Sequence, residues 1–221
     1  MRIVGGKFAG RDLTSPGKTR VRPTSEHVRA TLLDHLRADL PDARILDLFA
    51  GTGALGLEAL SRGSKTADFV EMNASSLHAL KANVVRFKLK ARTRVFVKDA
   101  IHFADALAAD RYDICFADPP YESKQLDWLI RVWHERRFSR VLAVEHAKSH
   151  EIPRGQVTLT FETTCVTIFR AARVPIDATA VVNRPTSVEA PNGAARRPSS
   201  PTGAPARTHP ATRAPTKRRR S

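Results

Sequence analysis

Apolar runs and amphipathic segments alternate regularly along residues 41–173, and this alternation restricts the fold more than any other feature. The first run, Ile45-Leu46-Asp47-Leu48-Phe49, has the pattern of a buried strand, and a helical pattern follows it. Strands and helices that alternate in this way build a parallel sheet with helices on both faces. The last two runs, 157–161 and 165–169, predict an antiparallel pair. We therefore expect an α/β protein with a mostly parallel seven-stranded sheet and an antiparallel C-terminal strand.

The expected strands are 45–49, 67–72, 95–97, 112–117, 141–144, 157–161 and 165–169, and the helices between them are 54–62, 75–88, 101–108 and 126–135.

Residues 1–40 form a separate basic extension before this alternating part, residues 41–173. Glycines between short apolar stretches in residues 1–22 predict a small hairpin or extended arm. Thr24 can cap a helix that carries Val28, Leu32, Leu36 and Leu40 on one face. The arm is dense in Lys and Arg, which favour phosphate groups, although a solvated sheet edge protected by such residues is an alternative. The residues that we expect to contact RNA are Arg2, Lys7, Arg11, Arg20, Arg22 and Thr24.

The net charge of the 221-residue chain is +15, from 37 Lys and Arg against 22 Asp and Glu. This excess favours a polyanionic partner, with nucleic acid before an anionic membrane. Residues 174–221 carry nine Lys and Arg against two acids, are rich in Pro, Ala, Thr and Ser, and lack hydrophobic periodicity. We expect a disordered basic tail there, either an electrostatic arm for nucleic acid or a solubilising appendage.

Several protein classes are disfavoured by composition. No apolar run approaches the roughly 18 residues of a membrane span, and the N-terminus lacks the apolar core of a signal peptide. Cys115 and Cys165 both lie in strand-like runs and are too few for a disulfide framework or a zinc site. We therefore expect reduced core cysteines, no metal, no membrane association and a cytoplasmic protein.

A glycine loop, Gly51-Thr52-Gly53-Ala54-Leu55-Gly56, follows the first strand and opens a helix with the full G-x-G-x-x-G spacing. Glycines allow a tight turn and let a ligand approach the backbone, and a helix N-terminus attracts negative charge. Glu71 lies 20 residues after Gly51 at the end of the next strand, where an acid can hold both hydroxyls of a ribose. The combination predicts a site for an adenosine-bearing cofactor.

Two cofactor classes fit this loop: a nicotinamide or flavin dinucleotide, and S-adenosylmethionine. Asp47 favours the second, because an acid within the first strand can face a cationic amino acid group, whereas a pyrophosphate needs no such partner. Asp99, at the end of the third strand, can accept a hydrogen bond from an adenine amino group. It can equally cap the helix that follows.

Asp118-Pro119-Pro120-Tyr121 follows the apolar strand 112–117 and therefore lies where a ligand crevice opens in a parallel sheet. The prolines stiffen the backbone and lack N–H donors, so their carbonyls are available as acceptors. A carboxylate, a rigid carbonyl and an aromatic ring together suit a planar group that bears an –NH2, such as a nucleobase.

The chain also contains Arg2-Ile3-Val4-Gly5-Gly6, Gly10-Arg11, Arg22-Pro23-Thr24, Val70-Glu71 and the long segment Leu46 to Gly63 around the glycine loop. With Asp118 to Tyr121, these motifs resemble the Rossmann-like class I methyltransferases. More narrowly, they resemble the bacterial guanine-N2 methyltransferases of 16S ribosomal RNA. The Arg-Pro-Thr block separates this family from generic amino-methyltransferases. The resemblance covers about residues 1–170.

This resemblance implies S-adenosylmethionine as the cofactor and a guanine amine as the methyl acceptor. Asp118 and the Pro119 carbonyl would accept the two N–H bonds of the amine, Pro120 would stiffen the turn, and Tyr121 would stack on the base. The expected cofactor-binding residues are Asp47, Phe49, Gly51, Thr52, Gly53, Glu71, Met72, Asp99 and Ala100.

The chain departs from the family pattern at Ala30 and Leu33-Asp34, and it lacks the usual glycine near Thr163-Thr164. Other functions are also compatible with parts of the sequence. A DNA amino-methyltransferase would use a similar clamp, and a non-catalytic ribosome assembly factor would bind RNA without turnover. We expect a monomer that acts on 16S ribosomal RNA within the 30S subunit or an assembly intermediate.

Overall fold

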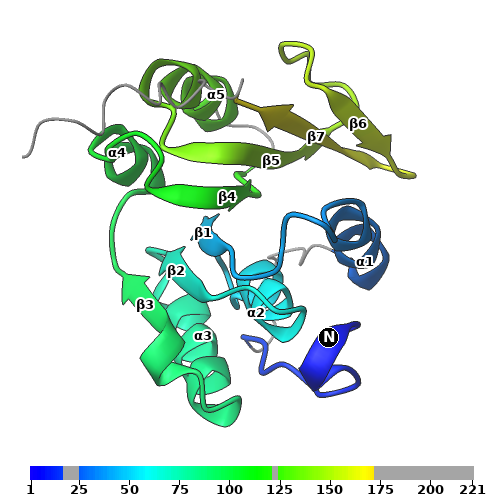
Figure 1. Cartoon of the computed structure of the whole chain (residues 1–221), viewed down its shortest axis with the longest axis vertical. Helices are drawn as coiled ribbons and strands as arrows, with labels where there is room; N and C mark the ends of the chain where they lie inside the picture. The colour runs from blue at the N-terminus through cyan, green and yellow to red at the C-terminus, as the bar shows by residue number, and fades with distance from the viewer. Residues whose placement is uncertain (17–24, 121–123, 172–221) are drawn as a thin grey trace, which may run out of the picture. The chain divides into compact units, whose positions relative to one another are not determined.

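Seven strands form one sheet in the order β3-β2-β1-β4-β5-β7-β6 (Figure 1). The structure is a computed structural model that describes residues 1–16, 25–120 and 124–171. Neighbouring strands from β1 to β5 all pair in parallel, whereas β7 runs antiparallel to both β5 and β6. The expected mostly parallel sheet with an antiparallel C-terminal strand is therefore confirmed.

The strands are β1 (Arg44–Leu48), β2 (Thr66–Val70), β3 (Thr93–Phe96), β4 (Tyr112–Ala117), β5 (Ser139–Ala147), β6 (Val157–Thr160) and β7 (Thr164–Arg170). The helices are α1 (Glu26–His35), α2 (Ala54–Ser61), α3 (Ala74–Arg86), α4 (Ala100–Asp105) and α5 (Gln125–Arg136), with short 3-10 turns at Gly6–Phe8 and Lys90–Arg92.

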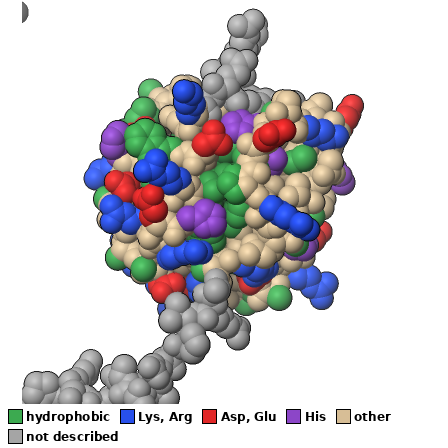
Figure 2. Space-filling view, turned by 90° about the horizontal axis from the view of Figure 1, so that it is seen from above, with side chains coloured by type: hydrophobic (Ala, Val, Ile, Leu, Met, Phe, Trp, Pro, Cys, Tyr) green, Lys and Arg blue, Asp and Glu red, His purple; other side chains and the backbone are tan. Residues whose placement is uncertain are grey.

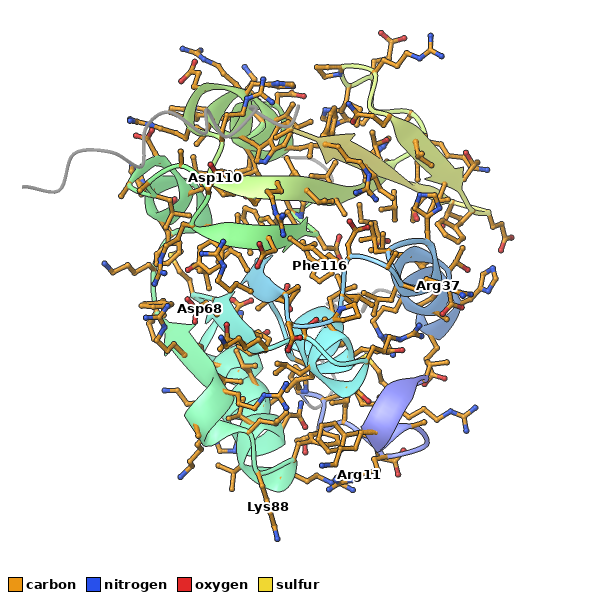
Figure 3. All side chains as sticks on the ribbon, viewed as in Figure 1. Arg11, Arg37, Asp68, Lys88, Asp110 and Phe116 are labelled. Carbon is orange, nitrogen blue, oxygen red and sulfur yellow. The ribbon has the colours of Figure 1, made fainter. Side chains whose placement is uncertain are left out.

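Helices cover both faces of the sheet (Figure 1). A hydrophobic layer lies between the sheet and the helices on each face. Helices α1, α2 and α3 pack on the face that carries Ile45, Phe116 and Ala143. Helices α4 and α5 pack on the opposite face, which includes Ala117 and Val144. Because side chains alternate along a strand, the two layers divide each central strand between them. Figure 3 labels Phe116 within the first layer.

The first helix differs from its predicted bounds at both ends. Its N-cap is Ser25, whose side chain accepts a hydrogen bond from the Val28 amide, while Thr24 lies outside the described residues. The helix ends at His35 with Leu36 as its C-cap, so the predicted continuation to Leu40 is wrong. Leu36 and Leu40 are nevertheless buried, because the turn that follows α1 packs them into the same hydrophobic layer as the helix.

The N-terminal residues fold back on themselves and onto α2. Arg2 pairs antiparallel with Asp12 in an isolated bridge, as a small hairpin requires, and Ile3, Phe8 and Leu13 are buried. The Phe8 amide donates to the Ser61 hydroxyl at 2.8 Å. Chain contacts place residues Met1–Val174 in one unit and Pro175–Ser221, which lie outside the described residues, in a second.

A buried ion pair joins the first two helices. Arg29 on α1 and Glu58 on α2 are both fully buried, with Nε and Oε2 3.2 Å apart. Arg29 also donates to the Arg2 carbonyl, and Glu58 accepts from the Gly5 amide. Asp34, one of the departures from the family pattern, pairs with Arg62 at the end of α2. The arm, α1 and α2 therefore form one polar network.

Cys115 and Cys165 are both free and buried, as expected. Burial raises the pKa of the Cys115 thiol well above its ordinary value. Among the helices of the described ranges, none has the length and apolar character to span a membrane.

Candidate cofactor and acceptor site

The glycine loop lies between the end of β1 and the start of α2. Gly51 and Gly53 have φ angles of 56° and 79°, in the left-handed region that favours glycine. A Cβ on Gly53 would lie 2.4 Å from Leu80 Cδ1, whereas one on Gly51 would meet nothing closer than 4.0 Å. Packing against Leu80 therefore requires glycine at position 53. At position 51 the absence of a side chain leaves the loop surface open to a ligand.

Asp47 lies beneath this loop and is 3% exposed. One carboxylate oxygen accepts a hydrogen bond of 2.9 Å from the Gly56 amide. A Cβ on Gly56 would lie 2.5 Å from a Phe69 ring carbon, so glycine is needed for α2 to approach the sheet here. Burial, with the negative charges of Asp118 and Glu71, raises the pKa of Asp47 to about 8. A cation bound at the loop would favour the charged carboxylate.

Glu71, which follows β2, is held by three backbone amides. One oxygen accepts from Gly51 at 2.7 Å, and the other accepts from Met72 at 2.8 Å and Asn73 at 2.6 Å. The carboxylate thus joins the glycine loop to the start of α3 and has a fixed orientation. This is the arrangement expected of an acid that receives ribose hydroxyls.

The remaining predicted cofactor residues lie around the same edge of the sheet. Asp99 is the N-cap of α4 and accepts from the His102 amide, which confirms the capping role that the sequence allowed. The hydrogen bond from the His102 amide lowers the pKa of Asp99. Ala100 is buried behind this cap, whereas Met72 is 60% exposed. An exposed thioether beside Glu71 offers an apolar surface to a planar ligand.

Phe49 makes the turn that leads from β1 into the glycine loop, and Thr52 joins the loop to α3. Phe49 has a φ angle of 58°, rare for an aromatic residue, at the turn out of β1. The Thr52 carbonyl accepts a 3.0 Å hydrogen bond from the Asn83 amide on α3. The same Asn83 side chain accepts from the Thr14 amide at 2.7 Å and donates to the Thr14 carbonyl at 3.0 Å. Sequence reasoning missed this link, because an Asn within a helix gives no signal of its distant partners.

Asp118-Pro119-Pro120 begins directly after β4, so the predicted acceptor turn lies at the same edge as the glycine loop. Asp118 is partly exposed, Pro119 is buried and Pro120 is exposed. The raised pKa of Asp47 includes a contribution from Asp118, which places the two carboxylates within electrostatic reach of each other. Tyr121 lies outside the described residues.

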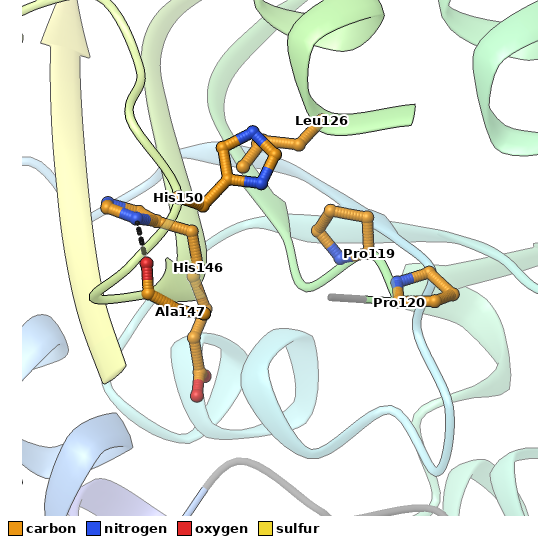
Figure 4. Close-up of a pocket in the computed structure, with 7 residues that line it drawn as sticks. Pro119, Pro120, Leu126, His146, Ala147 and His150 are labelled. Atoms are coloured by element: carbon orange, nitrogen blue, oxygen red, sulfur yellow. Dashed lines mark hydrogen bonds between the residues drawn. The ribbon is translucent and has the colours of Figure 1, made fainter. Parts of the chain in front are cut away.

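A small pocket lies beside this turn, with about 170 Å³ of empty space that includes open solvent (Figure 4). Its lining comprises Pro119, Pro120, Leu126, Glu145, His146, Ala147 and His150. Sequence analysis did not identify Glu145. Its signal was the position of an acid directly after the apolar run Val141–Val144, the same relation that Asp118 has to β4.

Four carboxylates therefore follow one another across neighbouring strands: Glu71 directly after β2, Asp47 within β1, Asp118 directly after β4 and Glu145 within β5. Asp47 pairs in register with Phe69 and Phe116, and Val144 pairs with Ala117. No group of three or more His, Cys, Asp or Glu within residues 1–16, 25–120 and 124–171 has the geometry to hold a metal ion.

The predicted RNA-contacting residues of the arm are partly engaged within the protein. Arg2 pairs with Glu26, with its Nε 3.2 Å from Oε2, and the Arg2 side chain remains 61% exposed. The Arg11 guanidinium donates to the Arg86 carbonyl and lies 4.5 Å from the Phe87 ring centroid, beside the end of α3 (Figure 3). Lys7 is exposed. Arg20, Arg22 and Thr24 lie outside the described residues.

On the face shown in Figure 2, Lys and Arg side chains are spread among acidic and His side chains around an apolar strip. The positive charge of this face is therefore dispersed, and a phosphate backbone would meet it at several separate points.

Comparison with known proteins identifies the family. Residues 1–164 match the model of the family described as Conserved hypothetical protein 95. The Ribosomal RNA small subunit methyltransferase D of Escherichia coli K12 is 35% identical over 159 residues, which are 72% of this chain and 79% of that protein. The chain belongs to this family.

Solved structures agree with this family and its fold. The Escherichia coli protein yhhF has a TM-score of 0.67 and 31% identity, and the match covers 77% of this chain and 97% of that one. SMU.776, whose structure is a complex with SAH, has a TM-score of 0.51 and 15% identity over 63% of this chain and 49% of its own. At that identity it supports the fold alone. The expected methyltransferase family and its Rossmann-like class I fold are confirmed.

Proposed function

We propose that this family member transfers a methyl group from S-adenosylmethionine to the N2 amine of a guanine in 16S ribosomal RNA. One observation carries the proposal: a loop suited to an adenosine-bearing cofactor and the Asp118-Pro119-Pro120 turn lie at the ends of adjacent parallel strands. A donor and an acceptor bound at these two places would meet at one edge of the sheet. The rRNA methyltransferase relatives support RNA as the acceptor.

The cofactor residues fit S-adenosylmethionine better than a dinucleotide. Glu71, held by three amides, suits the ribose hydroxyls. Met72 and Ala100 would lie beside the adenine. Asp47 is a buried acid whose neighbours raise its pKa, so it favours a cationic group over a pyrophosphate. When bound, S-adenosylmethionine supplies an activated methyl group, and the protein's main task is to position the acceptor.

Asp118 and the Pro119 carbonyl would perform that positioning. The lone pair of a guanine amine is delocalised into the ring, so the nitrogen is a poor nucleophile. Two acceptors on its N–H groups favour a more tetrahedral nitrogen, which can attack the methyl carbon. The S–CH3 bond breaks as the N–CH3 bond forms, and the positive charge moves to the nitrogen beside Asp118. The amine then loses a proton to Asp118 or to water, leaving N2-methylguanine and a neutral thioether.

The substrate is proposed to be the 30S subunit or its assembly intermediate, with a monomeric enzyme in the cytoplasm. A guanine that is stacked or paired must first be flipped out of the RNA. Basic residues of the arm, such as Lys7 and the exposed part of Arg2, would contact the phosphates. Residues 174–221 would add a salt-dependent attraction.

Methyl transfer from tritiated S-adenosylmethionine tests the proposal. The acceptors are 16S ribosomal RNA, 30S particles lacking native methylation, 23S ribosomal RNA and DNA. The methylated nucleoside is then identified. We expect N2-methylguanosine, from 16S ribosomal RNA or 30S particles. N6-methyladenine in DNA would identify a DNA amino-methyltransferase instead. RNA binding without cofactor binding or turnover would identify an assembly factor.

A further inference from the structure

We propose that Glu145 makes the acceptor site selective for guanine by accepting a hydrogen bond from the N1–H of the base. This inference rests on the proposed function, because it concerns the base whose N2 amine lies at Asp118. Glu145 lies on β5, beside β4, which ends one residue before Asp118, and it lines the pocket with Pro119 and Pro120 (Figure 4).

Strand register brings Glu145 next to Asp118. Ala117 pairs with Val144, so the residue after each one extends the same alignment, and adjacent strands are about 4.8 Å apart. Phe116 and Ala143 contribute to one hydrophobic layer, whereas Ala117 and Val144 contribute to the other. Continued alternation therefore directs Asp118 and Glu145 to the same face as Phe116 and Ala143.

This pairing matches the Watson–Crick edge of guanine. The N2 amine and N1–H are neighbouring donors, so two neighbouring carboxylates can receive them together. Adenine presents an N1 lone pair at the corresponding position, and a carboxylate repels it. Glu145 is only 6% exposed, and electrostatic preferences are strongest where water is excluded.

The polar side chains that line the pocket beside Glu145 are two histidines. The His146 ring lies 2.9 Å from the Thr167 hydroxyl and 3.0 Å from the Ala147 carbonyl. His150 lies 3.0 Å from Asp127 on α5. Leu126 is apolar. Among the residues that line this pocket, Glu145 carries the carboxylate and can accept from the N1–H of a base held at Asp118. A charged acceptor at N1–H would also push electron density into the ring and make the N2 amine more nucleophilic.

The test compares two substrates that differ at N1. The methylated nucleotide is first mapped, and RNA is then prepared with either guanine or 2-aminopurine at that position. 2-Aminopurine keeps the N2 amine but has a lone pair in place of N1–H. The measured quantity is the ratio of kcat/KM for the two substrates, in wild type and in Glu145→Gln. The amide of the variant can accept from N1–H or donate to N1.

We expect wild type to prefer guanine by about 10- to 100-fold, the range of one hydrogen bond to a charged group. In Glu145→Gln the ratio should fall to within about threefold, because the amide tolerates both bases. Glu135→Gln, a matched change of an exposed Glu on α5, should keep the wild-type ratio. The change in ratio between variants cancels the contribution of the O6 atom, which 2-aminopurine also lacks.

An unchanged ratio in a folded Glu145→Gln variant, or an equal loss on both substrates, would overturn the inference and leave Glu145 as a structural residue. If Glu145→Gln does not fold, Glu145→Ala replaces it: this variant cannot accept from N1–H, so the same fall in the ratio is expected and an unchanged ratio overturns the inference. Failure of the proposed function is a separate result, since wild type would then form no N2-methylguanosine on the guanine RNA.

Discussion

Replacement of Asp47 by Asn provides a direct test of how the site recognises its cofactor. Asp47 is buried below the glycine loop, and burial, with Asp118 and Glu71, raises its pKa from 3.8 to about 8. The causes of this shift include no cation. A cofactor that brings a positive group to Asp47 should therefore bind the ionised form and release the proton.

The size of the effect follows from the pKa. A rise in pKa from 3.8 to about 8, at about 1.4 kcal/mol per pKa unit, gives an upper limit of about 6 kcal/mol for ionising Asp47 in the folded apo protein. The native state binds more protons than the unfolded state between pH 4 and pH 8, so apo stability should fall as the pH rises through this window. Cofactor affinity should instead rise, by up to about tenfold per pH unit below pH 8.

Calorimetric titration with S-adenosylmethionine at pH 7 measures this coupling. Buffers of different ionisation enthalpy reveal the protons released on binding, and we expect nearly one per cofactor for wild type. In Asp47→Asn the side chain still accepts from the Gly56 amide but cannot ionise. The variant should therefore bind more weakly, release no proton, and keep a nearly constant unfolding temperature between pH 6 and pH 8.

Cofactor binding by wild type without proton release at pH 7 would exclude this role of Asp47. The same proton release from Asp47→Asn as from wild type would also exclude it, since another group would then titrate. The amino group of the cofactor itself titrates at higher pH, and the Asn variant provides the control for that contribution.

Three further predictions follow from other parts of the structure. Asp118→Asn should lower kcat by about 100-fold or more and leave cofactor affinity nearly unchanged, with Asp105→Asn as the control; lost cofactor binding would contradict the acceptor role. Arg29→Ala should destabilise the protein by about 3 kcal/mol in urea unfolding, because the buried Glu58 loses one of its two cations and keeps only Arg62, 3.1 Å away; a change below about 1 kcal/mol would contradict this. Deletion of residues 174–221 should lower RNA affinity mainly at low salt and preserve the melting temperature, whereas a large drop in that temperature would show that the tail supports the fold.

Local patterns were sufficient for much of the fold and for half of the site. The strand and helix alternation, the glycine loop and the cap at Asp99 all depend on neighbours close in sequence. The end of α1 could not be predicted in this way, because Leu36 and Leu40 keep helical spacing while they pack from a turn. Glu145 was missed for a related reason: one acid after an apolar run acquires meaning only when β5 is known to lie beside β4.

The three hydrogen bonds of Asn83 have a consequence for how binding at the arm and binding at the glycine loop affect each other. One side chain connects Thr14 of the basic arm to Thr52 of the glycine loop, so displacement of either segment disturbs a bond shared with the other. Thermodynamic reciprocity then requires that RNA at the proposed arm site and the cofactor at the proposed loop site would change each other's affinity by the same factor. Measuring cofactor affinity with and without RNA therefore gives both halves of this coupling at once.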